Sequence, residues 1–268
     1  MSRSPSTLSA GIRRTILEQS KRAGVGHIGS CLSVADALAA LYGSVLRVKR
    51  DDDPARDRLI MSKGHAALAL YAAMHASGRL SDEALDTYCA DGSAVAGHPE
   101  HFLPGVELST GSLGHGLSMG AGAALAGRLH GHDGRVFVLM SDAECNEGSV
   151  WEAVMFAAHH GLSSLVALVD ANGQQALGRT REVIDLDPLG DRWRAFGWNV
   201  HEIDGHDPDL LAQNLDALDG DAPHVVILKT VFGKGVSFME DELQWHYWPM
   251  SDEQYAAALS ELPEVAKT

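Results

Sequence analysis

Side chains that can bind a metal ion follow two apolar runs of the sequence. Asp142 comes just past the stretch 136–140, and Asp170, Asn172 and Gly173 end the stretch that begins at residue 165. Neighbouring parallel strands end at the same edge of a sheet, so we expect these side chains to lie close together. Carboxylate, amide and backbone oxygens suit Mg²⁺ or Ca²⁺. The alternative is that Asp142 caps the next helix and that Asn172-Gly173 only forms a turn.

A glycine-rich stretch spans residues 109–127 and includes Gly111, Gly114, Gly116, Gly120 and Gly122. A glycine-rich loop that leads into a helix lets backbone amides approach a ligand closely. No clear strand precedes it, which argues against a dinucleotide-binding motif. For Gly120 and Gly122 we expect close helix packing instead.

Several histidines lie next to glycines or in loops, namely His27, His65, His98, His115 and His246. Imidazoles donate hydrogen bonds to phosphate and sugar oxygens and move protons near neutral pH. A zinc site is the competing interpretation, but the spacing in "HPEH" (98–101), with no cysteine nearby, is poor for zinc. A structural role is the alternative for each histidine taken singly.

The elements that must position these residues alternate between strand and helix. Short, almost continuously apolar runs predict buried strands at 135–140, 165–170 and 224–229, with weaker ones at 58–62 and 198–203. Helical patterns occupy 34–46, 66–78, 116–130 and 149–161. This alternation predicts an α/β fold, doubly wound, with a mostly parallel sheet covered by helices on both faces. We expect one domain over residues 1–268, with irregular ends.

Composition narrows the class of protein. The 268-residue chain has a net charge of −15, which argues against nucleic acid as a partner, because phosphates are neutralised by clustered Lys and Arg. Cys31, Cys89 and Cys145 are far apart and show no paired spacing, so we expect a reducing compartment. No apolar run predicts a signal peptide or a membrane span. These observations predict a cytoplasmic protein.

Seven segments, in this order, resemble the N-terminal half of transketolases. They are "GHIGSCLSVADALAALY" (26–42), "DRLIMSKGHAALALYA" (57–72), "GHPE" (97–100), "GVELSTGSLGHGLSMGAGAALA" (105–126), "SDAECNEGSVWEA" (141–153), "LVDANGQQALG" (168–178) and "KTVFGKGVSFMEDELQWHY" (229–247). The resemblance covers almost the whole chain. It implies the thiamine-diphosphate-binding fold and transfer of a two-carbon ketol unit from a ketose to an aldehyde, with the cofactor as electron sink.

The resemblance also implies roles for individual residues. Mg²⁺ or Ca²⁺ would be bound by Asp142, Asn172 and the backbone oxygen of Gln174, and would bridge the cofactor's diphosphate. The implied cofactor-binding residues are His65, Ser112, Leu113, Gly114, His115, Asp142, Ala143, Glu144, Asn172 and His246. The implied catalytic residues, which would surround the reacting carbon and the sugar, are His27, His65, His98 and His246, together with Glu147 at a subunit interface.

The resemblance covers only the diphosphate-binding domain. In this family the glutamate that activates the cofactor lies in a pyrimidine-binding domain, and we expect both this domain and the C-terminal domain to be absent from this chain. We therefore expect one subunit of a split transketolase, with both missing domains on a partner chain, in an α2β2 assembly. Glu147 would communicate with the partner's glutamate.

This sequence departs from the family pattern at three places. Ser141 and Ala143 replace the glycines of Gly-Asp-Gly, and Ala143 is costly if its φ is positive. His115 replaces a glutamine, and Tyr247 and Trp248 follow His246, where they would narrow a sugar-phosphate pocket. Two alternatives remain: a carboligase that uses an α-keto acid donor, and a non-catalytic subunit that has lost the cofactor.

Overall fold

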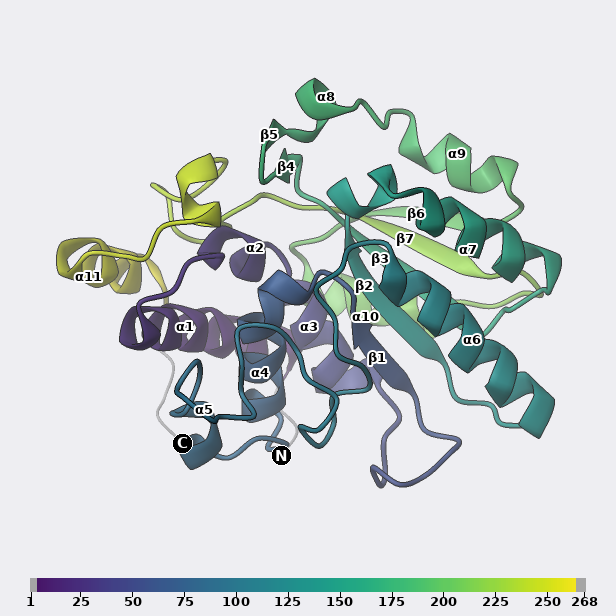
Figure 1. The fold of residues 1–268 in the computed structure, drawn as a ribbon, viewed down its shortest axis with the longest axis horizontal. Coiled ribbons are helices and arrows are strands. Elements are labelled where there is room, and N and C mark those ends of the chain that lie inside the picture. Colours follow the sequence, from purple (N-terminus) through teal and green to yellow (C-terminus); the bar gives the residue numbers. More distant parts are fainter. Residues whose placement is uncertain (1–3, 264–268) are drawn as a thin grey trace.

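The computed structural model describes residues 4–263 of the chain, and its central feature is a parallel five-stranded sheet with the order β1-β2-β3-β7-β6 (Figure 1). The expected mostly parallel α/β sheet is confirmed. The five strands, each within two residues of a predicted run, are β1 (Arg58–Met61), β2 (Val136–Ser141), β3 (Leu165–Ala171), β6 (Asn199–Asp204) and β7 (His224–Lys229).

Helices cover both faces of the sheet because successive residues of the central strands point to opposite faces. In β2, Phe137 and Leu139 pack in one apolar cluster with α1 (Pro5–Ala23), α3 (Ala35–Ala40), α4 (Ala67–Ala76) and α10 (Pro208–Asp216). Val138 and Met140 pack in a second cluster with α6 (His115–His130), α7 (Gly148–His159) and α9 (Leu189–Ala195). In Figure 1, α6 and α7 lie side by side, away from α1, α3 and α4.

The remaining elements are short or terminal. They are α2 (Ile28–Ser33), the π-helical turn η1 (Leu41–Val45), the 3-10 turns η2 (Gly64–Ala66), η3 (Ala143–Asn146) and η4 (Leu243–His246), α5 (Asp82–Leu85), α8 (Thr180–Val183), α11 (Asp252–Glu261) and the antiparallel hairpin of β4 (Gln174–Gln175) and β5 (Gly178–Arg179). The helix predicted at 34–46 is thus α3 followed by η1.

Helix α1 begins at Pro5, where Ser4 accepts a hydrogen bond from the amide of Thr7, and it ends at Gly24 in the left-handed conformation. The irregular first residues and tail that we expect at the two termini stay a prediction, because residues 1–3 and 264–268 lie outside the described part of the chain. Between residues 4 and 263, no helix combines the length and apolarity needed to cross a membrane.

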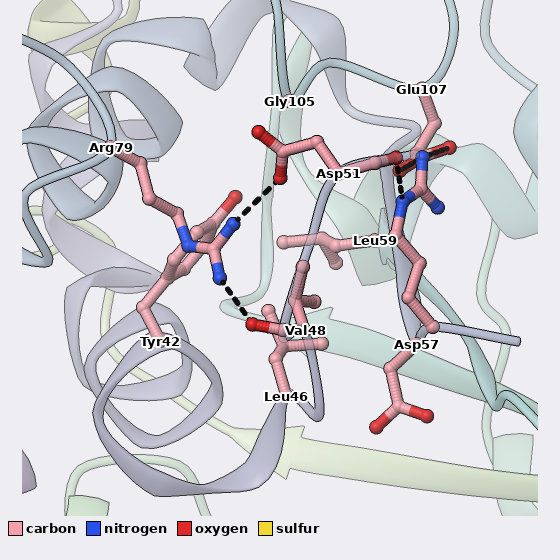
Figure 2. A pocket seen from close by; sticks show the side chains of 10 residues that line it. Tyr42, Leu46, Val48, Asp51, Asp57, Leu59, Arg79, Gly105 and Glu107 are labelled. Atoms are coloured by element: carbon pink, nitrogen blue, oxygen red, sulfur yellow. Dashed lines mark hydrogen bonds and ion pairs between the residues drawn. The ribbon is translucent and has the colours of Figure 1, made fainter. Parts of the chain in front are cut away.

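A cluster of ion pairs surrounds a small cavity of about 30 Å³ at the amino end of β1 (Figure 2). Arg79 donates to the carboxylate of Asp51 at 3.1 Å and to the carbonyl of Val48 at 3.3 Å. Arg56 pairs with Glu107 at 2.9 Å. These contacts fix the connection that enters β1, at the sheet edge opposite the polar carboxyl ends.

Candidate functional site

The expected metal ligands come together at the carboxyl ends of β2 and β3, which pair in register with Ser141 opposite Asp170. The Asp142 carboxylate accepts hydrogen bonds from the amide of Gly173 at 3.1 Å and from the hydroxyl of Thr180 at 2.8 Å. The Asn172 side-chain oxygen accepts from the amide of Gln174 at 3.0 Å. Asp142, Asn172 and Gln174 are all buried. We call residues 172–180 together with Asp142 the metal loop.

The metal loop rests on a buried charge pair that the sequence did not reveal. The Lys63 ammonium lies 2.5 Å from the carboxylate of Asp170, and neither side chain has exposed surface. Asp170 also accepts a hydrogen bond from the side-chain nitrogen of Asn172 at 2.7 Å. This bond orients the Asn172 side chain so that its oxygen faces the loop. Ser33 and Thr230 donate to the same carboxylate at 2.7 and 2.5 Å.

Electrostatics favour a cation at Asp142. Burial raises the pKa of this carboxyl to about 6, and the nearby Asp170 contributes in the same direction. The ammonium of Lys63 is already engaged with Asp170. A divalent ion would supply the missing positive charge, and the oxygen-only donor set matches the preference of Mg²⁺. The residues present therefore fit a divalent ion bound together with a diphosphate.

Three of the predicted histidines form one cluster. The rings of His27, His65 and His246 lie 5.1 to 5.4 Å apart, centroid to centroid, although they come from distant segments of the chain. The backbone amide of His27 donates to the carbonyl of His246 at 3.2 Å. The Nδ1 atoms of His27 and His246 are buried and have no hydrogen-bond partner. Such orphaned buried nitrogens are suited to bind a ligand's oxygen atoms.

The clustered histidines are neutral at physiological pH. Burial lowers the pKa of His246 to about 4 and holds the pKa of His65 well below its usual value. The pKa of His27 is lowered by burial and then by the neighbouring His98 and Lys63. A neutral imidazole has one donor and one acceptor nitrogen, so the cluster can hold and pass a proton.

The fourth expected catalytic histidine, His98, lies against the glycine-rich loop. A Cβ at Gly111 would come within 2.9 Å of the His98 ring, so glycine is needed there for the close approach. His98 lines an open cavity of about 440 Å³ with Ser112, His115 and Met119. Ser112 and His115 are exposed, and Leu113 is half-buried. Of the expected cofactor-binding residues in this loop, Ser112 and His115 thus line one cavity together with His98.

Glu144 lies behind this loop, although we expected it at the cofactor. The side chain is completely buried, and its carboxylate accepts hydrogen bonds from the amide of Gly114 at 2.8 Å and from the hydroxyl of Ser62. Its own amide donates to the Ser141 hydroxyl at 3.1 Å. Glu144 therefore holds the Gly114 loop against the end of β1 and has no group left for a ligand.

Glu147 lies on the other side of the same glycine. It is the exposed residue that precedes the first turn of α7. A Cβ added at Gly114 would come within 2.7 Å of the Cβ of Glu147. Gly114 has φ +86° and stands at the start of α6. Glu147 is therefore accessible from outside and lies against Gly114, the residue before His115 of the 440 Å³ cavity.

The substitutions around Asp142 are accommodated. Asp142 has φ −60°, and Ala143 is not among the residues with positive φ, so its methyl group causes no backbone strain. Asp142 also caps the short turn η3 by accepting from the amide of Ala143 at 2.7 Å. Asp142 thus caps this turn with one carboxylate oxygen, while its other oxygen faces Gly173 and Thr180. Ser141 contributes the hydroxyl that receives the Glu144 amide.

Two predictions about glycine packing have different outcomes. A Cβ at Gly120 would come within 2.5 Å of Val138, so close packing of α6 on β2 is confirmed there. Gly122 is exposed with no atom within 4 Å of a Cβ, so the packing role predicted for it is wrong.

Within residues 4–263, no three His, Cys, Asp or Glu side chains are grouped to hold a metal ion. The Asp142 set contains one carboxylate, one amide and one backbone oxygen.

Comparisons with known proteins agree with this arrangement. A family model described as the thiamine diphosphate binding domain of transketolase matches residues 6–263. An apulose-4-phosphate transketolase subunit of Phocaeicola vulgatus is 42% identical over 256 residues, covering 94% of this chain and 91% of that protein. The 6-deoxy-6-sulfo-D-fructose transketolase subunit SqwG of a Clostridium species is 39% identical, covering 94% and 93%.

Solved structures have the same fold. The transketolase of Campylobacter jejuni superposes with a TM-score of 0.89 at 30% identity, covering 97% of this chain and 43% of that chain. The transketolase of Leishmania mexicana gives a TM-score of 0.87 at 28% identity, covering 97% and 41%. This chain therefore spans about two fifths of each solved transketolase but over nine tenths of the two subunit relatives. The chain belongs to the transketolase family and corresponds to its thiamine diphosphate-binding domain.

Proposed function

We propose that this chain is the diphosphate-binding subunit of a split transketolase, formed by a single domain over residues 1–268. A partner chain supplies the pyrimidine-binding and C-terminal domains, and the complex transfers a two-carbon ketol unit from a ketose to an aldehyde. The observation that carries the proposal is the coverage: the chain spans over nine tenths of relatives named as transketolase subunits but only 43% of a solved transketolase. The cytoplasm is the proposed location.

In this proposal Asp142, Asn172 and the backbone oxygen of Gln174 would hold Mg²⁺, which would supply positive charge for the diphosphate. The convergence of Asp142 with the 172–174 segment supports this role. A divalent ion held by this buried carboxylate, whose pKa burial raises to about 6, would supply the positive charge through which a chain of net charge −15 binds an anionic cofactor. The amide of Ala143 lies next to this site.

The histidines contribute orientation and proton transfer. When bound, thiamine diphosphate supplies the carbon nucleophile and the electron sink for cleavage of the ketose C–C bond. The unpartnered Nδ1 atoms of His27 and His246 bind oxygens of the cofactor or sugar. His65, next to both rings, stays neutral and passes a proton within the cluster. His98, which lines the 440 Å³ cavity, contacts the sugar from there.

The partner covers the open cavity lined by His98, Ser112 and His115, in an α2β2 assembly. Glu147 beside this cavity is available to the partner's activating glutamate. Apolar side chains also remain exposed on the adjoining helices: Met119 of α6, and Met155 and Phe156 of α7, have exposed fractions of 44%, 50% and 41%. Exposed apolar surface of this kind is typical of a protein interface.

The test reconstitutes the two-chain complex and assays it with Mg²⁺ and thiamine diphosphate. The donors to try are those named for the relatives, apulose 4-phosphate and 6-deoxy-6-sulfo-D-fructose, with glyceraldehyde 3-phosphate as acceptor. We expect ketol transfer from a ketose donor by the complex and none by this chain alone. Release of CO₂ from pyruvate without ketose turnover would instead support the α-keto acid carboligase.

Calorimetry tests the remaining alternative, a non-catalytic subunit that has lost the cofactor. If the complete complex binds no thiamine diphosphate in the presence of Mg²⁺, the chain is a non-catalytic subunit. The absence of strain at Ala143 and the hydrogen bond accepted by Ser141 weigh against that outcome.

A further inference from the structure

Tyr247 connects the two halves of the site. Its hydroxyl donates a hydrogen bond to the carbonyl of Ala176, at the tip of the β4–β5 hairpin. Its ring lies 5.2 Å from the ring of His246, centroid to centroid. The hairpin belongs to the metal loop, and His246 belongs to the histidine cluster. One side chain therefore contacts both.

The histidine side of this connection is firmly packed. The Tyr247 backbone lies so close to Gly26 that a Cβ there would come within 2.4 Å of the Tyr247 carbonyl oxygen. The neighbouring His27 amide donates to the carbonyl of His246 at 3.2 Å. Phe232, completely buried, stacks on the His246 ring at 6.0 Å. The backbone of Tyr247 is thus held in place by its packing next to the histidine cluster.

The hairpin side is weakly supported by itself. Its two strands are two residues long each, and the side chain of Leu177 at the tip is 81% exposed. An isolated two-stranded hairpin is marginally stable at best. Apart from Tyr247, one contact joins the hairpin to the 241–247 segment, from the Gln174 side-chain amide to the carbonyl of Asp241 at 3.1 Å. In Figure 1 the hairpin and the yellow-green segment before α11 face each other.

The hairpin's position matters because metal-binding groups lie at its base. Gln174 begins β4, and Thr180, directly after β5, donates to the Asp142 carboxylate at 2.8 Å. Displacement of the hairpin would move both residues relative to Asp142. Binding groups held in the bound geometry before the ligand arrives bind it more tightly, because less ordering is needed.

We propose that Tyr247 is a positioning residue that ties the β4–β5 hairpin to the histidine cluster and so preorganises the metal loop for Mg²⁺ and diphosphate. The inference rests on the proposed function in taking the metal loop as the diphosphate site. The phenol hydroxyl is the essential group, because it alone makes the hydrogen bond to Ala176. The aromatic ring spans the distance between His246 and the hairpin.

The test compares Tyr247→Phe with wild type in the two-chain complex. Tyr255→Phe, which removes a hydroxyl from α11, is the matched control. We expect amide hydrogen exchange of residues 174–179 to become about five- to tenfold faster in Tyr247→Phe, the change expected for loss of one hydrogen bond. The Kd for thiamine diphosphate with Mg²⁺ should rise by a similar factor, with kcat at saturating cofactor within about twofold of wild type. Tyr255→Phe should match wild type in all three measurements.

Unchanged hairpin exchange in Tyr247→Phe overturns the proposal, and so does a large fall in kcat with unchanged Kd, which would make Tyr247 part of the chemistry. If Tyr247→Ala loosens the hairpin but Tyr247→Phe does not, the ring rather than the hydroxyl is responsible, and the proposed tie is wrong. Hydrogen exchange measures the tie without any cofactor. If the wild-type complex binds no thiamine diphosphate, the proposed function fails while the exchange result still decides the role of Tyr247 in holding the hairpin.

Discussion

Lys63 and Asp170 form a salt bridge of 2.5 Å between two side chains without exposed surface, directly below the metal loop. The pair joins the end of β1 to the end of β3, which lie on either side of β2 in the sheet. Lys63 also donates to the carbonyl of Ser30 at 3.3 Å, and Asp170 accepts from Asn172 at 2.7 Å. The pair thereby links the histidine side of the site to a predicted metal ligand.

Asp170→Ala should lower the free energy of unfolding of this chain by about 3–5 kcal/mol, because it leaves the Lys63 ammonium buried without a counter-ion. Urea unfolding of the purified chain measures the effect. The double variant Lys63→Met/Asp170→Leu should recover part of the stability, because it removes both buried charges, although leucine is larger than aspartate and leaves the Ser33 and Thr230 hydroxyls without their acceptor. It should still bind thiamine diphosphate and Mg²⁺ more weakly, since the Asn172 amide loses its acceptor. Wild-type stability in Asp170→Ala would show that the pair is not essential to the fold.

Asp142→Asn should abolish Mg²⁺-dependent binding of thiamine diphosphate to the two-chain complex. The change removes the one negative charge of the proposed ligand set, and we expect a loss of affinity of more than about 100-fold. Asp185→Asn is the control, because Asp185 is an exposed carboxylate that lines the same cavity as Asp142. Calorimetry with and without Mg²⁺ provides the measurement. Full affinity in Asp142→Asn would mean that the metal assignment is mistaken.

The sequence predicts the sheet well because its strands are buried on both faces. Runs such as 135–140 and 165–170 are almost continuously apolar, since each of the two faces takes every second residue. The order of the strands is harder to predict from the sequence, because the insertion of β7 between β3 and β6 depends on how the crossovers pack. Helix α1 is missing from our predicted helices, although the sequence carries usable signals for it: Ser4 as cap, Pro5 in the first turn and Gly24 at the end.

In the candidate site, too, some features follow from the sequence and others do not. The proximity of Asp142 to Asn172 follows from two apolar runs that are neighbouring parallel strands. The cluster of His27, His65 and His246 joins distant segments, and only the resemblance to transketolases connected them. No local pattern identifies the Lys63–Asp170 pair or the buried position of Glu144. Both depend on how the ends of β1, β2 and β3 lie against each other, which periodicity does not encode.

Gly114→Ala and Gly122→Ala should have opposite effects on stability, although both glycines belong to the same glycine-rich stretch. At Gly114, φ is +86° and a Cβ would come within 2.5 Å of the Ser149 hydroxyl oxygen, so alanine should cost about 1–3 kcal/mol. At Gly122, exposed in α6 with nothing within 4 Å, alanine should stabilise by about 0.5–1 kcal/mol through helix propensity.

Urea unfolding of the two glycine variants, side by side with wild type, measures these changes. Gly114→Ala should also weaken binding of thiamine diphosphate to the complex, because Glu144 holds the Gly114 amide at 2.8 Å and the strained loop would leave that position. If both variants are stabilised equally, the left-handed conformation of Gly114 is not required by the fold.

A pair of histidines far from the metal loop should make stability depend on pH. His201 of β6 and His224 of β7 lie with Nε2 and Nδ1 3.3 Å apart and with stacked rings. Burial lowers the pKa of both, and the neighbouring His201 lowers that of His224 further. An unfolded histidine titrates near 6.5. Between the lowered folded pKa and about 6.5, the unfolded chain therefore binds more protons, so stability that is complete above about 6.5 decreases as the pH falls below it.

His224→Gln should reduce this pH dependence, because glutamine keeps a polar side chain at the position without a titrating group. Thermal unfolding of the chain between pH 7.5 and 5.5 provides the measurement, with His130→Gln at the exposed end of α6 as the control for loss of a surface imidazole. The buried histidines of the site add their own pH dependence to every variant, so the informative quantity is the difference in slope from wild type. Parallel curves for wild type and His224→Gln would show that protonation of this pair does not oppose folding. A flatter curve for His224→Gln alone would locate part of the acid sensitivity at the β6–β7 edge, where both rings are held together by the parallel pairing of the two strands.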